Sequence, residues 1–343
     1  MSDWHWDEVI VAIDGGNSKT DVAVVSVRGD LLGRARGPGA SPQTVGVDRA
    51  VTVFEELAVR ALAAAGPTSS SRPFVRHVSA YLAGLDLPYE EETVRHALLA
   101  RGWSPSVAVG NDTFALLRTG SADGTGVALV CGAGINCVGV GRDGRVHRFP
   151  ALGRISGDWG GGLVLGEEAL WWAVRAEDGR GPATALRYEV PRQFGLDAVT
   201  DVVWALHTGA LAPAALHELC PVLFAVAAGG DTVAAAVVAR LVEEVSTMVG
   251  VSLRRLAMTA EPAAVVLGGG VLTGVGPGVI AEIRRRCART APLADVRVAE
   301  LAPVFGAALL GLDALNAGAA AAKSLMSAGL DEGLGVGDDG PDC

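Results

Sequence analysis

The chain has few cysteines, and their positions suit neither a disulfide framework nor a zinc site. Disulfide-held extracellular domains usually carry an even set of cysteines, and zinc sites use close pairs such as C-x-x-C. The cysteines here are an odd number and lie far apart, at Cys131, Cys137, Cys220, Cys287 and Cys343. The six histidines also lack the spacing of metal ligands. We therefore expect reduced thiols in a cytoplasmic protein.

Positive charge is also scarce, which limits the kinds of partner. The sequence contains 28 Lys and Arg residues against 38 Asp and Glu residues, so its formal net charge is -10 at pH 7. This excess of negative charge disfavours nucleic acid or an anionic membrane as the main partner. It does not disfavour a nucleotide, which is held by local dipoles. The acidic start, MSDWHWDEV, shows no signal peptide, and no uncharged apolar run reaches transmembrane length.

Two catalytic motifs are missing. There is no G-x-S-x-G, so a nucleophile elbow is not supported. The stretch VAIDGGNSKTDVAVV contains the Lys-Thr pair of a P-loop, but Ile13 and Ser18 stand at the two glycine positions of that motif. Residues 20–27 are rich in β-branched side chains and predict a strand, whereas a helix follows a P-loop. The segment is therefore a strand, a glycine turn that presents backbone N–H groups, and a second strand.

The chain is long enough for two domains of ordinary size, and half of its residues are hydrophobic. Residues 9–36 predict three strands joined by tight turns, and residues 125–149 repeat this order although few residues match. We interpret this as a weak internal repeat, which predicts two domains of related topology. If the two domains face one another, both glycine turns lie at one cleft.

Apolar residues at helical spacing predict several helices, and a strand is expected at residues 77–86. Residues 191–225 look helical but irregular, and the glycine-rich acidic end is expected to be disordered. The clearest helical patterns cover residues 48–65, 163–178, 231–257 and 303–317.

Three glycine turns each follow an apolar strand, at residues 14–16, 131–134 and 268–270. Without a Cβ atom, backbone N–H groups come close to an anion. Tight hairpins need glycine anyway, but three such turns are better explained by one ligand with several phosphates. Asp14 suits a Mg²⁺ held partly through water, unless it only bonds its own turn. Lys19 either neutralises a phosphate or is a solvated charge.

Two further aspartates lie between a predicted strand or glycine loop and a helix. In VGNDTFALL, Asn111 and Asp112 suit a helix N-cap, or Asp112 is a general base that takes the proton of an attacking hydroxyl. In SGDWGGG, Asp158 either caps a helix or accepts hydrogen bonds from a polyol, with Trp159 as a flat wall.

These motifs resemble those of a known group. IDGGNSKTDVAVV, ALVCGAGINCVGV and AVVLGGGVL are similar, in order, to the first phosphate, second phosphate and adenosine motifs of the actin-like ATPase superfamily. With V-x-N-D and S-G-D-W-G, they resemble the N-acetylglucosamine kinase branch of the sugar kinases. That branch shares its sequence family with ATPases that activate benzoyl-CoA reductase. The resemblance covers about residues 9–317.

The resemblance implies an α/β fold of two actin-like (ribonuclease H-like) domains around a nucleotide cleft. The first domain would be residues 1–119 with a returning helix in 303–326, and the second residues 120–302. Residues 327–343 would form the acidic tail. The resemblance also implies a homodimer, with ATP and Mg²⁺ as cofactors.

The resemblance gives each motif residue an expected role. Asp112 would be the catalytic base, Asp158 and Asn136 would bind sugar hydroxyls, and Asp14 would hold the metal. Further sugar-binding residues would be Asn111, Gly157 and Ser41. ATP would be bound by Gly15, Gly16, Asn17, Ser18, Lys19, Thr20, Gly132, Gly134, Gly268, Gly269 and Gly270.

Two departures from the family pattern concern the sugar. Ser41 stands near the position of an Asn that usually contacts the sugar, and Ala133 and Ile135 replace a frequent Thr and Ser. One buried hydrogen bond is worth ~1–3 kcal/mol of discrimination between substrates. The expected reaction is ATP-dependent phosphorylation of N-acetylglucosamine or a related hexosamine to its 6-phosphate, with the choice of sugar left open.

Two rival functions use similar motifs. An ATPase switch of the benzoyl-CoA reductase activator type would bind an iron–sulfur cluster through cysteines at a dimer interface. Cys131 and Cys137 instead lie in or beside a predicted phosphate turn. A sugar-sensing regulator would need a DNA-binding module, for which neither the lead before the first strand nor the acidic tail offers room.

Overall fold

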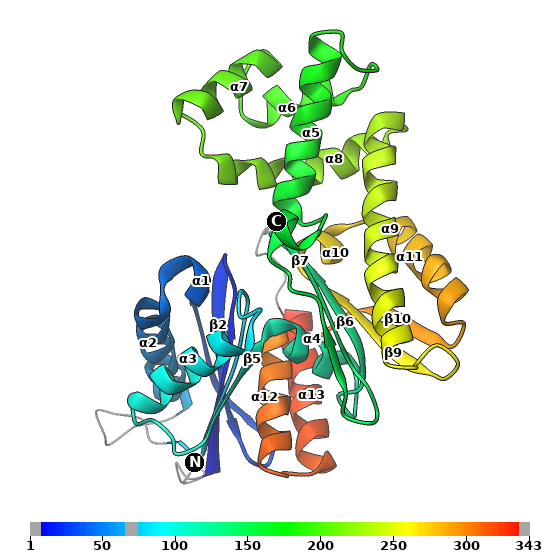
Figure 1. Ribbon diagram of the computed structural model, residues 1–343. Coiled ribbons are helices and arrows are strands. Elements are labelled where there is room, and N and C mark those ends of the chain that lie inside the picture. The colour runs from blue at the N-terminus through cyan, green and yellow to red at the C-terminus, as the bar shows by residue number, and fades with distance from the viewer. Residues whose placement is uncertain (1–7, 66–74, 336–343) are drawn as a thin grey trace. The chain divides into compact units, whose positions relative to one another are not determined.

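The computed structural model describes residues 8–65 and 75–335, which form two compact units (Figure 1). The first unit runs to Ala128 and resumes at Ala299, and the second runs from Leu129 to Val298. The sequence placed these changes at 119/120 and 302/303. Each unit carries a five-stranded sheet with helices, so the predicted α/β class with two actin-like domains is confirmed.

The first unit has the sheet order β3-β2-β1-β4-β5. β1 pairs antiparallel with β2 and parallel with β4, so the predicted hairpin forms one half of the sheet. Its strands are β1 (Val9–Gly15), β2 (Lys19–Ser26), β3 (Leu31–Pro38), β4 (His77–Leu82) and β5 (Val107–Asn111). Its helices are α1 (Pro42–Val45), α2 (Val47–Ala65), α3 (Pro88–Ala100), α4 (Asp112–Gly120), α12 (Pro303–Ala314) and α13 (Ala319–Gly335).

Both faces of this sheet are covered, which explains why β1 is a continuous apolar run rather than an alternating one. Val11 and Ile13 pack in the core under α2 and α3, whereas Ile10 and Ala12 pack in the core under α12. Helices α12 and α4 pack closely because residue 306 is glycine: a Cβ there would lie 1.9 Å from the Ala115 carbonyl oxygen of α4. The apolar residues of β1 therefore fix Asp14, at its end, between two rigid layers.

The second unit repeats the first, with the sheet order β10-β9-β6-β7-β8. In both sheets the first strand is central, with the second and third on one side and the fourth and fifth on the other. This confirms the internal repeat. The strands are β6 (Gly126–Cys131), β7 (Ile135–Val140), β8 (Val146–Arg148), β9 (Ala263–Gly268) and β10 (Ala294–Val298).

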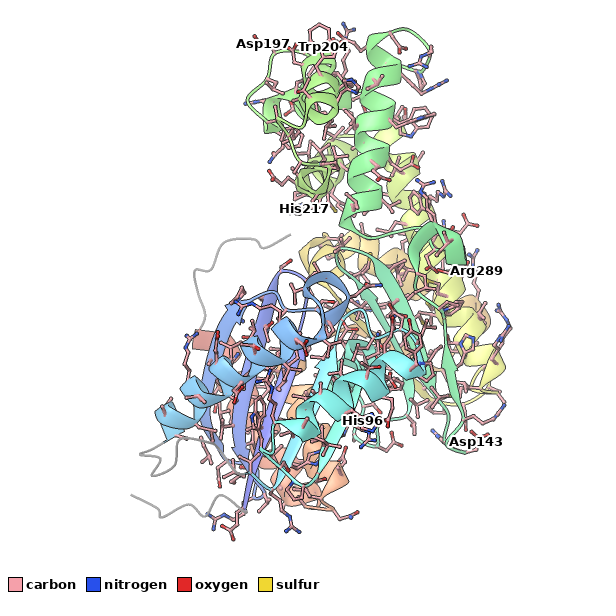
Figure 2. All side chains as sticks on the ribbon, turned by 60° about the vertical axis from the view of Figure 1, so that its left-hand side comes forward. His96, Asp143, Asp197, Trp204, His217 and Arg289 are labelled. Atoms are coloured by element: carbon pink, nitrogen blue, oxygen red, sulfur yellow. The ribbon has the colours of Figure 1, made fainter. Side chains whose placement is uncertain are left out.

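The helices of the second unit are more numerous than the sequence suggested. The irregular stretch resolves into separate short helices, and α5 to α8 form a helical group in which Trp204 and Asp197 lie at the end (Figures 1 and 2). Trp204 is 63% exposed. The helices are α5 (Gly162–Glu177), α6 (Leu186–Gln193), α7 (Val199–Thr208), α8 (Leu219–Ala228), α9 (Thr232–Arg255), α10 (Gly270–Gly274) and α11 (Pro277–Thr290), with 3-10 turns η2 (Gly153–Ser156) and η3 (Pro213–Glu218).

One sequence expectation was wrong: disorder does not begin at residue 327. Helix α13 continues to Gly335, and only residues 336–343 of the expected tail lie outside the described residues. The glycines suggested disorder, but a Cβ at Gly329 would lie 2.8 Å from Leu301 and 3.0 Å from Phe305. This glycine therefore allows α13 to pack closely, and Leu325 is fully buried beside it.

Across the two described ranges, no single helix is both long and apolar enough to cross a bilayer. Pro213–Ala228 and Thr232–Arg255 meet that length and composition only as a pair, which is bent by 113°.

Candidate active site

The first phosphate motif forms the turn between β1 and β2. Gly16 N donates to the Lys19 carbonyl oxygen at 2.8 Å, and Ala40 N donates to the Gly16 carbonyl oxygen at 3.1 Å. A Cβ at Gly39 would lie 1.8 Å from the Asn17 carbonyl oxygen, so the backbone just after β3 packs directly against the turn. Asn17, Ser18 and Lys19 are exposed. The turn thus has a fixed backbone and an open side.

Two of the predicted residues beside this turn do not face solvent. Thr20 is fully buried, and its hydroxyl has no hydrogen-bond partner among residues 8–65 and 75–335. Ser41 is 1% exposed and donates its hydroxyl to the Ala83 carbonyl oxygen at 2.9 Å. Ser41 therefore attaches α1 to the loop after β4, and a contact between Ser41 and a sugar stays a prediction.

Asp14 lies among other charges at the end of β1. Across the sheet it is in register with Asp21, which is in register with Arg36. Arg36 donates to both oxygens of Asp21, at 2.8 and 3.1 Å, so this pair is bidentate. Burial, then the charges of Asp112 and Asp21, raise the pKa of Asp14 to about 8, although Lys19 and Arg36 oppose the shift. The half-buried Asp14 carboxylate therefore sits where a cation is favoured.

Asp112 is the first residue of α4, directly after β5. Burial raises its pKa to about 6, while backbone N–H groups of Thr113 and of Asp112 itself lower it. A carboxylate with this pKa is charged at neutral pH yet basic enough to accept a proton, which suits a general base. The preceding residue, Asn111, caps the helix through its side chain, which accepts from Thr113 N at 3.1 Å.

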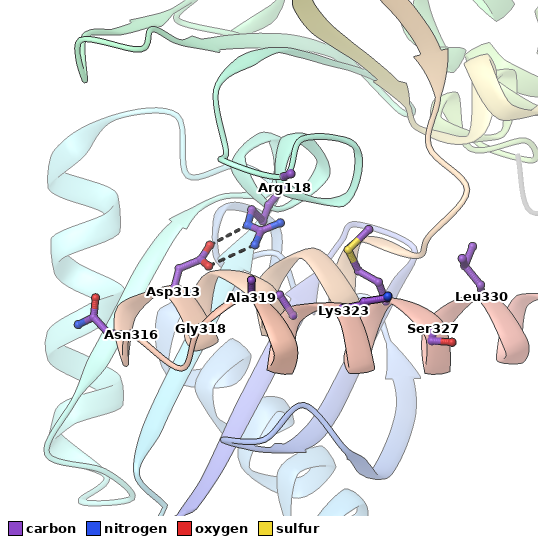
Figure 3. A pocket seen from close by; sticks show the side chains of 11 residues that line it. Arg118, Asp313, Asn316, Gly318, Ala319, Lys323, Ser327 and Leu330 are labelled. Atoms are coloured by element: carbon purple, nitrogen blue, oxygen red, sulfur yellow. Dashed lines mark hydrogen bonds and ion pairs between the residues drawn. The ribbon is translucent and has the colours of Figure 1, made fainter.

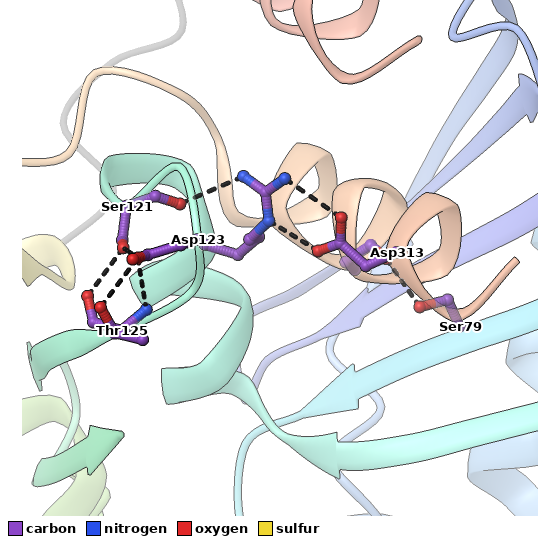
Figure 4. Close-up of polar contacts among 7 residues, drawn as sticks. Ser79, Ser121, Asp123, Thr125 and Asp313 are labelled. Carbon is purple, nitrogen blue, oxygen red and sulfur yellow. Dashed lines mark hydrogen bonds and ion pairs between the residues drawn. The ribbon is translucent and has the colours of Figure 1, made fainter. Parts of the chain in front are cut away.

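The other end of α4 is tied to α12 by an ion pair between the buried Arg118 and the half-exposed Asp313 (Figure 4). Arg118 is 4% exposed and donates to Asp313 at 2.7 and 3.2 Å and to the Ser121 carbonyl oxygen at 3.1 Å. The helix that begins with Asp112 is therefore held at both ends. Next to this pair lies a pocket of about 760 Å³ lined by α12, α13 and the end of α4 (Figure 3). None of the motif residues lines this pocket.

The second unit brings its own glycine segments together. Gly132 N donates to the Gly134 carbonyl oxygen at 2.9 Å, and Gly162 N donates to the Gly132 carbonyl oxygen at 2.7 Å. A Cβ at Gly161 would lie 2.5 Å from the Ala133 carbonyl oxygen, and one at Gly269 would lie 2.5 Å from the Cys131 carbonyl oxygen. The turn after β6, the loop before α5 and the turn after β9 therefore form one glycine-rich site. Gly270 begins α10, and Gly268 is buried at the end of β9.

Asp158 holds its own loop together. Its Oδ2 accepts from Gly153 N at 3.0 Å and from the Ser156 hydroxyl at 2.6 Å, so it closes the 3-10 turn η2, whose C-cap is Gly157. Trp159 is 6% exposed, with the Arg240 guanidinium 4.1 Å from its ring centroid, so it packs in the interior rather than forming an open wall. Asn136 is half-buried on β7.

Residues 11–311 match the BadF/BadG/BcrA/BcrD ATPase family. The chain belongs to this family. It is 24% identical over 322 residues to the N-acetyl-D-glucosamine kinase of Dictyostelium discoideum, covering 89% of this chain and 98% of that protein. It is 23% identical over 267 residues to the N-acetylmuramic acid/N-acetylglucosamine kinase of Clostridium acetobutylicum, covering 78% and 86%.

A solved structure shares the fold of this chain. The candidate N-acetylglucosamine kinase of Chromobacterium violaceum superposes with a TM-score of 0.67 at 20% identity, over 88% of this chain and 98% of that one. Membership of an ATPase family implies that ATP is used. Around the turn after β6, a Cβ at Gly161 or Gly269 would collide with backbone, whereas Gly134 has open space around it. Among residues 8–65 and 75–335, no group of three or more His, Cys, Asp and Glu side chains could hold a metal ion alone.

One residue of the site was not anticipated from the sequence of this ATPase. Asp86 lies in the loop between β4 and α3, is 9% exposed, and accepts from Asn111 Nδ2 at 3.0 Å. The available signal was an aspartate at the end of the predicted strand 77–86, as Asp14 is at the end of its own strand. Asp86 lies outside the three glycine turns, so the phosphate motifs do not point to it.

Proposed function

We propose that this ATPase-family protein transfers the γ-phosphoryl group of ATP to a hydroxyl of N-acetylglucosamine or a related hexosamine, giving the 6-phosphate. The observation that carries the proposal is Asp112, a half-buried carboxylate with a pKa of about 6 beside the charged end of β1. The activities named for the two curated relatives support the same class of substrate.

In this mechanism Asp112 accepts the proton of the attacking hydroxyl. At neutral pH the group is mostly ionised, and its fixed place at the start of α4 holds it in one orientation. Backbone N–H groups of the turn after β1, together with the Lys19 ammonium, face the phosphates and offset their charge. The glycine site after β6 supplies further N–H groups. Exclusion of water prevents hydrolysis from competing with transfer to the sugar.

Mg²⁺ is part of the proposal, and the residues present fit it. Asp14 supplies the hard oxygen ligand that Mg²⁺ prefers, and the neighbouring Asp112 and Asp21 add negative charge. Protein sites for Mg²⁺ commonly use one or two carboxylates, with water and substrate phosphates as the other ligands. When bound, the ion would neutralise charge on the phosphates.

We also propose that the protein acts in the cytoplasm as a homodimer. The homodimer rests on the resemblance to the sugar kinases. The location is supported by the thiols of Cys131, Cys137 and Cys287, which are free and buried.

The test is a coupled assay of ADP release over hexoses, hexosamines and N-acetylhexosamines. We expect N-acetylglucosamine or a close relative to raise ADP release well above the rate with ATP alone. Asp112→Asn should keep ATP affinity within a few-fold and lower kcat by ~10²–10⁴-fold, because only the proton acceptor is lost. If no sugar raises ADP release, or if the Asn variant turns over like the wild type, the proposal fails.

The rival activator function is disfavoured by the cysteines. Cluster ligands must be thiolates, but burial raises the pKa of Cys131 and Cys137 to about 12 and that of Cys287 to about 11. These cysteines lie inside the second unit rather than on its surface. The protein should therefore purify colourless, whereas an oxygen-sensitive brown protein with bound iron would favour the activator.

A further inference from the structure

The loop between β4 and α3 contacts the segment that carries Asp112. The side chain of Asn111 donates from Nδ2 to the Leu85 carbonyl oxygen at 3.2 Å and to Asp86 Oδ1 at 3.0 Å. Its Oδ1 accepts from Thr113 N at 3.1 Å and from the Thr113 hydroxyl. Asn111 is 1% exposed and Asp86 is 9% exposed, so this contact lies in the interior.

The orientation of the Asn111 amide follows from its partners. A backbone N–H can only donate, so the atom that faces Thr113 N must be the oxygen. The nitrogen then faces Leu85 O and Asp86 Oδ1, which can both accept. Turning the amide over would place its oxygen against these two acceptors and its N–H groups against the N–H of Thr113. The carboxylate of Asp86 therefore favours the rotamer in which Asn111 caps α4.

Asp86 is itself held in place from α3. Glu90 Oε2 accepts from the backbone N–H groups of Asp86 and Leu87, each at 2.9 Å, at the start of that helix. Pro88 at the first helical position further restricts the backbone. The backbone of Asp86 is thus fixed independently of Asn111. Its carboxylate can therefore hold the Asn111 side chain in place by accepting from Nδ2.

We propose that Asp86 is a positioning residue for the reaction: through Asn111 it fixes the first turn of α4 and hence the direction in which Asp112 presents its carboxylate. The proposal rests on the proposed function for Asp112, since it assigns Asp86 a purpose in the same site. A shift of about 1 Å in a catalytic group is enough to lower a rate by up to ~100-fold.

The test compares two substitutions of Asp86 with a core variant. Asp86→Ala removes the acceptor for Asn111 Nδ2, whereas Asp86→Asn keeps a side-chain oxygen at the same place. Val94→Ala shortens a side chain of α3 that is 1% exposed, so it lowers stability without touching Asn111. For each variant, kcat and KM are measured with ATP and N-acetylglucosamine, and amide hydrogen exchange is measured at Thr113.

We expect Asp86→Ala to lower kcat by at least about tenfold while KM for ATP changes less than about twofold. Exchange at Thr113 should rise by about tenfold or more, because the Asn111 cap is released. Asp86→Asn should recover kcat to within about threefold of the wild type, since its oxygen accepts the same bond. Val94→Ala should lower the melting temperature with kcat and Thr113 exchange near wild-type values.

Two results would overturn the inference. One is a wild-type kcat and unchanged Thr113 exchange in Asp86→Ala; the other is equal loss of kcat in Asp86→Ala and Val94→Ala at equal loss of stability. Failure of the proposed function looks different, because the wild type would then release no ADP with any sugar. Thr113 exchange would still decide whether Asp86 controls the start of α4.

Discussion

Replacing Asp14 by Asn should stabilise the ligand-free protein, although it removes a residue of the proposed active site. Burial and the charges of Asp112 and Asp21 raise the pKa of Asp14 from 3.8 to about 8, so the ionised carboxylate is disfavoured in the folded chain. Asn keeps the size and the hydrogen-bonding oxygen but carries no charge. The substitution therefore removes repulsion between neighbouring carboxylates.

The sign and pH range follow from proton linkage. Between pH 3.8 and about 8 the folded chain keeps a proton on Asp14 that the unfolded chain releases. The free energy of unfolding of the wild type therefore falls as pH rises through this range, and the Asn variant lacks this contribution. The two proteins should be equally stable near pH 4 and should differ most above pH 8.

The gain in free energy of unfolding from Asp14→Asn has an upper limit set by the pKa shift, and the expected gain is smaller. Each pH unit between the two pKa values corresponds to ~1.4 kcal/mol, so the full interval is about 6 kcal/mol. The side chain is only half-buried, and an effective dielectric constant of about 20 reduces the penalty to ~1–3 kcal/mol. For a domain of this size, that corresponds to a rise in melting temperature of about 2–12 °C.

The assay is thermal unfolding of both proteins from pH 4 to pH 9, without ATP or divalent cations. Asp48→Asn is the matched control, because Asp48 is exposed in the first turn of α2 and its loss should cost ~0.3–1 kcal/mol. Adding ATP and Mg²⁺ should stabilise the wild type more than the Asp14→Asn variant. Parallel stability curves for wild type and variant, or a less stable variant at pH 8, would refute the electrostatic reasoning.

Four other predictions concern catalysis, ATP binding, sugar preference and stability. The kcat of the wild type should fall about tenfold per unit below pH 6, because protonated Asp112 cannot accept a proton; a flat profile of kcat from pH 5 to 8 would contradict this. Gly39→Ala should raise KM for ATP by about tenfold by displacing the first phosphate turn, whereas Gly278→Ala, which has free space, should not. Ala133→Thr, at an exposed position, should raise the preference for N-acetylglucosamine over glucose, measured as a ratio of kcat/KM, by ~5–100-fold. Ile135→Ser should mainly lower the melting temperature, because Ile135 is 6% exposed; a changed sugar preference without loss of stability would argue against this.

The sequence by itself determined the elements that carry the chemistry. Apolar strands broken by glycine turns predicted both hairpins, and the order of the motifs predicted the repeated topology seen in the two sheets. Asp112 was identified as a candidate because it stands where a strand becomes a helix, and the structure places it at the first residue of α4. These features depend on neighbours within a few residues, so periodicity and turn chemistry reveal them.

Tertiary structure decided which side chains face the site and what supports them. Thr20 and Ser41 lie in motif segments, yet both are buried, because the strands and loops packed around them determine which side is covered. Asp86 reaches Asn111 across 25 positions in the chain, and α13 is ordered by contacts with Leu301 and Phe305. Such contacts form only when parallel strands and a returning helix come together, and no local pattern of residues encodes them.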